Sequence, residues 1–363
     1  MNDPTASWPA LPGEELGGFE LEAVAGRGGM GVVYLARQHN PERKVALKVI
    51  APELADDPKF ADRFRRESGI AAQLEHPNVI PVYATGDQDG TLYLAMRFVD
   101  GTDLRHVIAE EGRLEPTRAA QIVDQVAQAL DAAHSQGLVH RDVKPANILI
   151  APVGEREHVY LTDFGLTRRA ESTTGVTVTQ TGVFLGTPDY VAPEQARGER
   201  VDARADVYSL GCVLFQALTA TVPFAGRNNL AKLYAHATEP PPRVLDRAPA
   251  VPAAFDVVLA RAMAKAPDDR YPSAGDLGRA ALAAASGISV SRAERSVASG
   301  DAAPPPTIGR GLAATKPPAP RPRSETGTIG RGLAATKPPS RPRPAGGRET
   351  GTDDEDVRDL GSA

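Results

Sequence analysis

The stretch HRDVKPAN, residues 140–147, places a histidine, an arginine, an aspartate, a lysine and an asparagine within eight positions of a 363-residue chain. Working outward, a glycine-rich segment GRGGMG lies upstream at residues 26–31, and a lysine follows it at Lys48. Downstream lie DFG at residues 163–165 and APE at residues 192–194. A chance run of five such ordered motifs is negligible, so these positions indicate a functional site rather than surface composition.

The glycine-rich segment alone fits more than one fold. Dinucleotide-binding folds and nucleotide-covering hairpins both use glycines to let backbone N–H groups approach phosphates. A dinucleotide site needs a helix directly after the glycines, whereas residues 32–37 and 44–50 are β-branched and alternating, like residues 19–24 before them. We therefore expect the turn of a β-hairpin. On this segment alone, a structural glycine turn without a ligand stays an alternative.

Lys48 lies inside the apolar strand expected over residues 44–50. A buried ammonium group is costly unless it meets an anion. Two anions are candidates: a phosphate under the glycine hairpin, and Glu67 in the helical segment expected over residues 59–74. Taken alone, Glu67 fits equally well on the exposed face of that helix, among neighbouring arginines.

With these residues in view, the stretch 140–147 resembles the catalytic loop of protein kinases, HRDxKxxN, and the other four motifs match that family in order. The resemblance covers residues 18–284. It implies an α+β, two-lobed protein kinase fold, with a small antiparallel β lobe containing one helix up to about residue 96. A larger, mostly helical lobe would begin at about residue 101. Strings such as GGMG, FRRE and VAPEQA are similar to bacterial eukaryotic-like (Hanks-type) serine/threonine kinases, and the chain resembles a soluble actinobacterial member.

The resemblance implies a role for each polar residue. Phosphoryl transfer needs a carboxylate that orients the incoming hydroxyl, and Asp142 fits this role. Asn147 and Asp163 would hold Mg²⁺ on the phosphates of ATP, while Lys48 and Lys144 would contact phosphate oxygens.

The same resemblance assigns Glu67 to Lys48 as its partner. It also gives a set of ATP-covering residues in the glycine hairpin and along the strand and hinge beside it. These are Ala25, Gly26, Arg27, Gly28, Gly29, Met30, Gly31, Val33, Lys48, Met96 and Val99.

The implied reaction is transfer of the γ-phosphoryl group of ATP to Ser or Thr hydroxyls of protein substrates. Lys144, two residues after Asp142, goes with serine/threonine rather than tyrosine specificity in the family, as does Gly186-Thr187. The alternative is a pseudokinase, a nucleotide-sensing scaffold that recruits partners through its tail. Every catalytic position is intact, which favours the enzyme.

Scaffold roles and departures also follow from the resemblance. Asp206 would steady the catalytic loop, and Arg270 would pair with Glu194. Arg97 replaces an often acidic hinge residue, and we expect it to change only the charge at the rim of the site. The segment between Asn147 and Asp163 is slightly longer than is usual in the family. Its extra residues 151–158 are expected to lengthen a surface hairpin between two strands.

The segment between residues 165 and 186 contains seven Ser and Thr residues. In the family, an arginine directly before the catalytic aspartate, here Arg141, marks kinases that are switched on by phosphorylation of this loop. Thr179 and Thr181 have the family's spacing from Thr187. We expect autophosphorylation at one or both, through a transient homodimer.

Composition bounds the class of protein. Hydrophobic residues make up 41% and charged residues 24% of the chain, as in ordinary globular proteins. The single cysteine, Cys212, excludes a disulfide framework and a cysteine-built zinc site, and we expect it in the core. The longest apolar stretch, residues 207–220, is shorter than the roughly 20 residues a membrane span needs. No secretory signal is visible, so we expect a cytoplasmic protein.

Both ends of the chain differ from the body. Residues 1–17 are expected to form an N-terminal extension. Residues 285–363 lack aromatic residues, are rich in proline and arginine, and are expected to be disordered. Residues 307–318 recur 21 positions later at 328–339, which suggests a linear motif for a phosphothreonine-binding domain. Two alternatives stay open, a contact with nucleic acid or another anionic surface, and a solvated tail without a fixed partner; nucleic acid is the least favoured partner.

Overall fold

The glycine-rich segment forms the turn of an antiparallel hairpin, as predicted. In the computed structural model, which describes residues 12–154, 156–164, 188–288 and 294–305, strand β2 (Phe19–Gly28) pairs with β3 (Gly31–His39). Gly28 and Gly31 face each other across the turn, and no helix follows the glycines. A dinucleotide-binding fold would have a helix directly after the glycines. Strand β3 follows them instead, so that fold is excluded.

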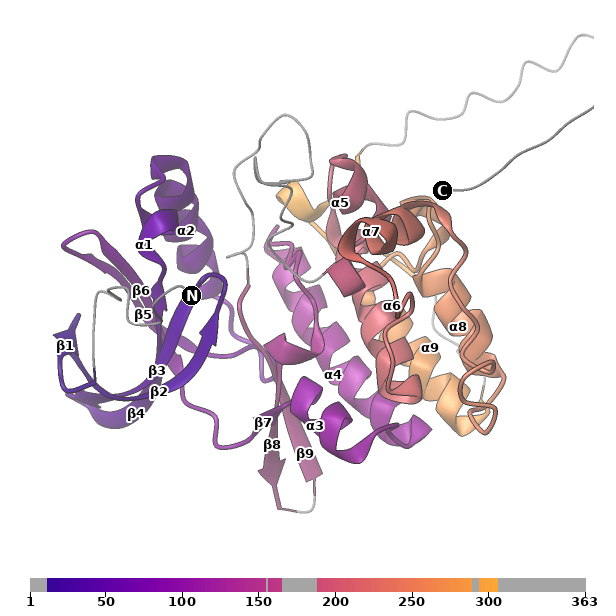
Figure 1. Ribbon diagram of the computed structural model, residues 1–363, viewed down its shortest axis with the longest axis horizontal. Coiled ribbons are helices and arrows are strands. Elements are labelled where there is room, and N and C mark those ends of the chain that lie inside the picture. The colour runs from indigo at the N-terminus through magenta and orange to yellow at the C-terminus, as the bar shows by residue number, and fades with distance from the viewer. Residues whose placement is uncertain (1–11, 155, 165–187, 289–293, 306–363) are drawn as a thin grey trace, which may run out of the picture. The chain divides into compact units, whose positions relative to one another are not determined.

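The hairpin opens a six-stranded antiparallel sheet in the order β1-β2-β3-β4-β6-β5 (Figure 1). Its other strands are β1 (Glu15–Leu16), β4 (Glu42–Ile50), β5 (Val82–Gln88) and β6 (Thr91–Arg97). Leu16 is buried in the sheet's core, so the packed part of the small lobe begins before residue 18. The expected N-terminal extension over residues 1–17 is corrected on this point, because β1 adds an edge strand to β2.

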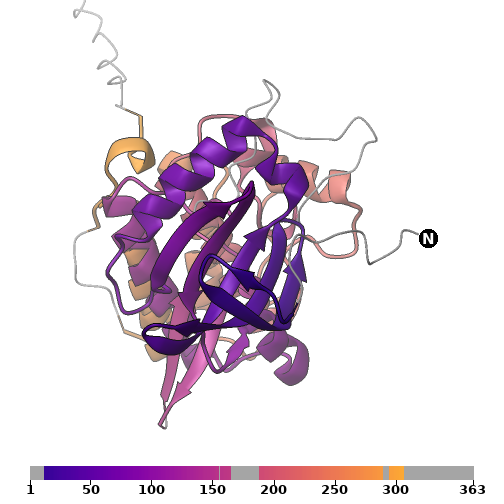
Figure 2. The same cartoon turned by 90° about the vertical axis from the view of Figure 1, so that its left-hand side faces the viewer.

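Helix α2 (Pro58–Ala71) lies against the sheet (Figure 2). Its Phe60 and Phe64 lie in one cluster with Leu92 and Leu94 of β6. Asp57 caps the helix by accepting a hydrogen bond from the Lys59 amide. The helix ends three residues before the expected residue 74. A short helix α1 (Pro52–Ala55), which the sequence did not indicate, precedes it.

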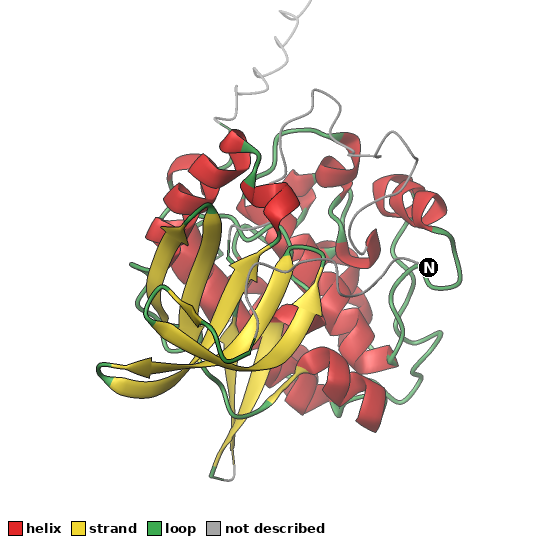
Figure 3. Ribbon diagram, turned by 60° about the vertical axis from the view of Figure 1, so that its left-hand side comes forward, coloured by secondary structure: helices red, strands yellow, loops and turns green. Residues whose placement is uncertain are grey.

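The larger lobe is mostly helical, as the colouring of Figure 3 shows. Its helices are α3 (Leu104–Glu111), α4 (Pro116–Ser135), α5 (Pro193–Arg197), α6 (Ala203–Thr219), α7 (Asn229–Thr238), α8 (Ala254–Ala262) and α9 (Ala274–Ser286). A three-stranded sheet accompanies them, made of β7 (Thr102–Asp103), β8 (Ile148–Val153) and β9 (Arg156–Leu161). The expected extra hairpin over residues 151–158 is the end of the β8–β9 pair, so that prediction is confirmed.

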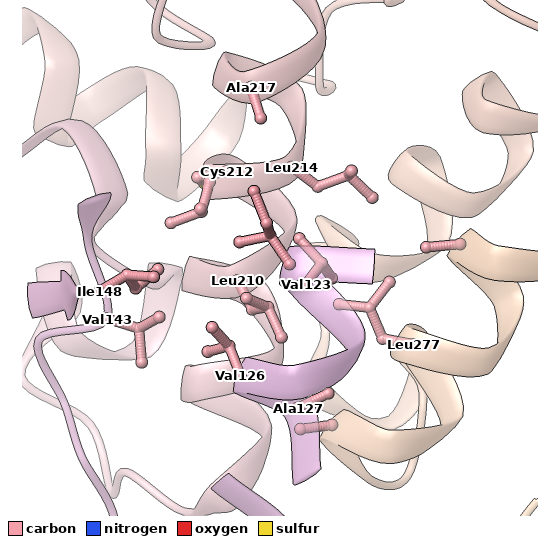
Figure 4. Close-up of a cluster of buried hydrophobic side chains, with 14 of the residues drawn as sticks. Val123, Val126, Ala127, Val143, Ile148, Leu210, Cys212, Leu214, Ala217 and Leu277 are labelled. Carbon is pink, nitrogen blue, oxygen red and sulfur yellow. The ribbon is translucent and has the colours of Figure 1, made fainter. Parts of the chain in front are cut away.

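Helices α4, α6 and α9 share the core of the larger lobe. Val123 and Val126 of α4, Leu210 of α6 and Leu277 of α9 point toward one another in Figure 4 and are almost fully buried. Cys212 lies in the same cluster, as expected for a core residue, and burial raises the pKa of its thiol. No helix in the described part of the chain has the length and apolar character that crossing a membrane requires.

Helix α9 ends at Ser286, and Gly287 follows it in the left-handed conformation at φ 68°. The packed part of the chain does not end there. Residues 294–305 lie against the larger lobe, and Ala302 among them is fully buried. The expected domain boundary at residue 284 is therefore too early. The repeats at residues 307–318 and 328–339 lie outside the described residues, as does the rest of the tail.

We expect Gly31→Ala to disturb the glycine hairpin. Gly31 has φ 150°, and a Cβ there would lie 1.9 Å from the Val49 carbonyl oxygen. The backbone must shift to avoid this clash. The shift should lower the free energy of unfolding by about 1–3 kcal/mol and weaken ATP binding. Thermal denaturation and nucleotide titration measure both effects.

Gly29→Ala is the matched control for this substitution, because nothing lies within 4 Å of a Cβ placed at Gly29. It should leave stability close to that of the unmodified protein. Equal behaviour of the two variants would show that the close approach at Gly31 does not constrain the hairpin.

Candidate active site

The loop of residues 140–147 is held from behind by the carboxylate of Asp206, in the first turn of α6. Oδ2 accepts the His140 amide at 2.8 Å, and Oδ1 accepts the Arg141 amide at 2.7 Å. His134, near the end of α4, donates from Nε2 to Oδ2 at 2.7 Å. Burial raises the pKa of Asp206, but these donors outweigh burial and hold the pKa below its usual value. The predicted scaffold role of Asp206 is confirmed.

His140 connects this loop to the segment that precedes Phe164. Its Nε2 lies 2.8 Å from the Thr162 carbonyl oxygen, and its Nδ1 lies 3.3 Å from the Asp142 amide. A neutral ring that donates through Nε2 and accepts at Nδ1 satisfies both contacts. The ring also packs against Phe164, with centroids 4.8 Å apart. His140 therefore fixes Asp142 and the 162–164 segment relative to each other.

Asp142, Lys144 and Asn147 converge on one point. Lys144 Nζ lies 2.6 Å from Asp142 Oδ2. Asn147 donates from Nδ2 to the Asp142 carbonyl oxygen at 2.8 Å and to Oδ2 at 3.3 Å. Asn147 lies in the short 3₁₀ helix η1 (Pro145–Asn147) and leads into β8. Because Nδ2 is used, the amide oxygen of Asn147 is the atom that can serve as a metal ligand.

Lys48 and Asp163 form a second charged group. Lys48, buried on β4, lies with Nζ 2.8 Å from Asp163 Oδ1. Burial raises the pKa of the Asp163 carboxyl, but the Lys48 ammonium outweighs burial and lowers the pKa below its usual value; Lys144 contributes to this lowering. Asp163 has φ 67°, a conformation that few non-glycine residues adopt. A strained backbone and a charged pair at one position are typical of functional sites.

The predicted ATP-covering residues lie on the glycine hairpin and on the strands beside it. Residues 25–31 occupy the end of β2, the turn and the start of β3, while Val33 lies opposite Lys48 in the β3–β4 register. Met96, near the end of β6, is buried and accepts a hydrogen bond from Thr162 Oγ1 at 3.5 Å. Val99 follows in the connection to the larger lobe and is half-buried.

Comparison with known proteins decides the family. Residues 19–273 match the protein kinase domain. This chain belongs to the protein kinase family. The kinase PknI of Mycobacterium tuberculosis has a crystallised kinase domain that is 32% identical to this chain. The two structures match with a TM-score of 0.62, and the match covers 77% of this chain and all of the PknI kinase domain.

Two curated relatives are named serine/threonine-protein kinases. PknH of M. tuberculosis is 45% identical over 269 residues, covering 74% of this chain and 42% of the relative. PknJ of the same organism is 46% identical over 275 residues, covering 75% of this chain and 46% of the relative. The chain thus spans less than half the length of these relatives.

One kinase pair expected from the sequence is not formed here. Lys48 pairs with Asp163, and a Lys48–Glu67 ion pair is not among those of the described residues. Glu67 is buried on α2, with Oε1 3.6 Å from Arg66. The expected partnership is corrected on this point, because the carboxylate that reaches the Lys48 ammonium comes from the larger lobe.

Other contacts of the kinase site were expected only in part. Arg270 and Glu194 form the predicted buried pair, with two N–O distances of 2.7 Å. Arg97 was expected to alter only the rim charge, but it donates to the Tyr160 hydroxyl on β9 at 3.1 Å. Gln195 was missed as a contact residue. It donates to the Arg141 carbonyl oxygen at 2.9 Å, and its place directly after APE is the only signal in the sequence.

Thr179 and Thr181, the predicted phosphorylation sites, lie outside the described residues. So do Gly165 of the DFG motif and Thr187. The site described here therefore comprises the catalytic loop, Lys48, Asp163 and the glycine hairpin.

We expect Asp206→Asn to loosen the catalytic loop. The side-chain NH₂ group of asparagine would face His134 Nε2, the His140 amide or the Arg141 amide, each of which donates a hydrogen bond to Asp206. Two donors would then face each other, and part of the buried hydrogen-bond network would be unsatisfied. The free energy of unfolding should fall by about 3 kcal/mol, and phosphate transfer should drop at least tenfold. Chemical denaturation and a peptide phosphorylation assay measure these effects.

Asp202→Asn serves as the matched control. Asp202 is also buried at the start of α6, where it caps the helix and pairs with Arg204, but within the described part of the chain it forms no hydrogen bond to the catalytic loop. This variant should lose some stability and keep its kcat. Equal losses of kcat in the two variants would contradict the anchoring role of Asp206.

Proposed function

We propose that this chain is a serine/threonine protein kinase that transfers the γ-phosphoryl group of ATP to protein hydroxyls. One observation carries the proposal. Two charged groups, Lys48–Asp163 and Asp142–Lys144–Asn147, are joined through His140 and the Thr162 carbonyl into one connected site. Preorganised charges of this kind are the main requirement of phosphoryl transfer, which involves little covalent chemistry by the protein.

The oxygen donors of the site fit Mg²⁺ with ATP. Magnesium in phosphoryl-transfer sites is held by one or two carboxylates together with substrate phosphates, and it keeps several waters. The Asp163 carboxylate and the Asn147 amide oxygen would supply the protein's ligands. Bound Mg²⁺ would supply positive charge that neutralises the phosphate oxygens. The lowered pKa keeps Asp163 ionised for this role at neutral pH.

The Lys48–Asp163 pair suggests how nucleotide is accepted. Each partner is the counterion that the other needs while both are partly or fully buried. On binding, Lys48 would turn to phosphate oxygens and Asp163 to the cation, so neither charge is left uncompensated. The residues at 25–31, with Val33, Met96 and Val99, would cover the rest of the nucleotide.

Asp142 would orient the substrate hydroxyl and accept its proton. Lys144, 2.6 Å from that carboxylate, would offset the negative charge that develops on the transferred group. The position of Lys144, two residues after Asp142, and the names of the relatives PknH and PknJ support serine/threonine specificity. Protein substrates follow from the family.

We expect Lys48→Met to abolish phosphate transfer in a protein that still folds. Methionine can occupy a similar volume in strand β4 without the charge. Asp142→Asn should act likewise by removing the proton acceptor. A fall in kcat of about 100-fold or more is expected for each, measured with a generic Ser/Thr peptide, ATP and Mg²⁺.

Lys44→Met is the matched control, since Lys44 lies four residues earlier on the same strand with its side chain exposed. It should keep full activity. The proposed function fails if the unmodified protein binds ATP but transfers no phosphate, which is the behaviour of a pseudokinase. Near-normal turnover by Lys48→Met or Asp142→Asn would refute that residue's role.

We further propose that autophosphorylation at Thr179, Thr181 or both activates the kinase. Arg141 adjoins Asp142 directly, and its backbone is fixed at both ends, by Asp206 at the amide and by Gln195 at the carbonyl. A phosphate that reaches the Arg141 guanidinium would form charge-assisted hydrogen bonds beside the catalytic residue.

Autophosphorylated protein should therefore turn over a peptide roughly tenfold faster than phosphatase-treated protein. The double variant Thr179→Ala, Thr181→Ala should stay at the slow rate after incubation with ATP. The double variant Ser172→Ala, Thr173→Ala, in the same segment, should still be activated. Equal rates in all preparations would exclude phosphorylation of this segment as the switch.

A further inference from the structure

Residues 294–305, here called the strap, lie beyond the kinase match at 19–273 and pack on the larger lobe. Ala302, in the 3₁₀ turn η4 (Gly300–Ala302), is fully buried. It lies in one apolar cluster with Val139 and Ala203, and Val201 and Ala298 pack at its edge. Small side chains allow this close contact.

Hydrogen bonds fix the strap to the last turn of α4. The Ser299 amide donates to the His134 carbonyl oxygen at 2.9 Å. The Ser299 hydroxyl donates to the Ser135 carbonyl oxygen at 2.5 Å. The last carbonyls of a helix lack partners within the helix, so the strap satisfies groups that otherwise need water or a cap.

The surface of the lobe is shaped for this approach at Gly137, just after α4. Gly137 has φ 79°, which favours glycine, and a Cβ there would lie 3.4 Å from the Ser299 carbonyl oxygen. A side chain at this position would be strained by the backbone conformation, and its Cβ would be in van der Waals contact with the strap.

Polar contacts hold the strap at both ends. Glu294 forms a two-pronged ion pair with Arg261 of α8, at 2.7 and 2.6 Å. The adjacent Arg295 amide donates to Asp276 of α9 at 3.2 Å. At the far end, Arg200 donates to the Ala303 carbonyl oxygen at 3.4 Å. The strap is therefore attached along its whole described length.

The strap touches the pieces of the lobe that meet at Asp206. Val139 directly precedes His140, whose amide donates to Asp206. Ala203 begins α6, three residues before Asp206. His134 accepts from the strap at its carbonyl and donates to Asp206 from its ring, so one residue takes part in both contacts.

We propose that the strap is a positioning element for the catalytic loop. By packing Ala302 between Val139 and Ala203 and by binding the end of α4, it keeps His134, His140 and Asp206 in register. The residues it steadies hold Asp142, so the strap acts on the rate of phosphate transfer rather than on nucleotide binding. This inference rests on the proposed kinase function.

The test uses the full-length chain with Ala302→Glu, which places a carboxylate in the buried cluster and should release the strap. The kcat for a peptide should fall roughly tenfold, because small misplacements of a catalytic group are costly, while the KM for ATP stays within twofold. Amide hydrogen exchange at His140 and Arg141 should speed up, with the core amides of α9 unchanged.

Pro305→Glu is the matched control, since it adds the same carboxylate at an exposed position of the strap. It should match the unmodified protein in kcat and in exchange. Ala302→Ser, which nearly preserves side-chain size, should recover most of the rate. If Ala302→Glu does not fold, Ser299→Ala replaces it, since it removes only the hydroxyl bond to Ser135; kcat should then fall about twofold to threefold, with KM for ATP unchanged.

Unchanged kcat and unchanged exchange at His140 and Arg141 in Ala302→Glu would overturn the inference. So would an equal rise in exchange throughout the larger lobe, because that would mark a general loss of stability. Failure of the unmodified chain to transfer phosphate would instead refute the proposed function, so the two failures are distinguishable.

Discussion

The buried carboxylate of Asp206 collects hydrogen bonds from His134, His140 and Arg141, which belong to the end of α4 and to the loop after it. A buried charge is tolerated only when such donors compensate it, and the same low dielectric strengthens each bond. These hydrogen bonds therefore hold the loop that carries Asp142 in one conformation. Asp206, at the start of α6, fixes the backbone amides of His140 and Arg141. The position of α6 in the larger lobe therefore determines the position of Asp142.

The charges in front of that anchor are balanced in pairs. Lys48 meets Asp163, and Lys144 meets Asp142, so positive and negative groups from both lobes neutralise each other. Burying an unpaired charge would cost several kcal/mol, which explains why the buried Lys48 is paired with a carboxylate from a distant segment of the chain. The pairs thus keep the charged groups that the proposed binding of ATP and Mg²⁺ requires, and they remain compatible with a folded interior.

Much of the fold and the site could be predicted from the sequence, for physical reasons that differ by residue. The β-branched strands after residues 26–31 decided for a hairpin, since side-chain periodicity is a local property. The scaffold role of Asp206 followed from the resemblance to protein kinases, and the structure contains the contacts that this role requires. The role of Asp142 as proton acceptor follows from the same resemblance and stays a prediction. The partner of Lys48 could not be derived in this way. Whether Glu67 or Asp163 reaches that ammonium depends on the placement of α2 relative to the other lobe, which no local pattern records.

The strap escaped prediction because its attachment uses few large side chains. Alanines and backbone groups carry most of it, and composition alone suggested a solvated tail. Its hydrogen bond from Ser299 to Ser135 joins residues 164 positions apart. Closing so long a loop costs chain entropy before any contact repays it, so we expect the strap to dock after the lobe beneath it has formed. In unfolding, we expect the strap to detach before the lobe beneath it opens, and its release would expose the last carbonyls of α4 to solvent.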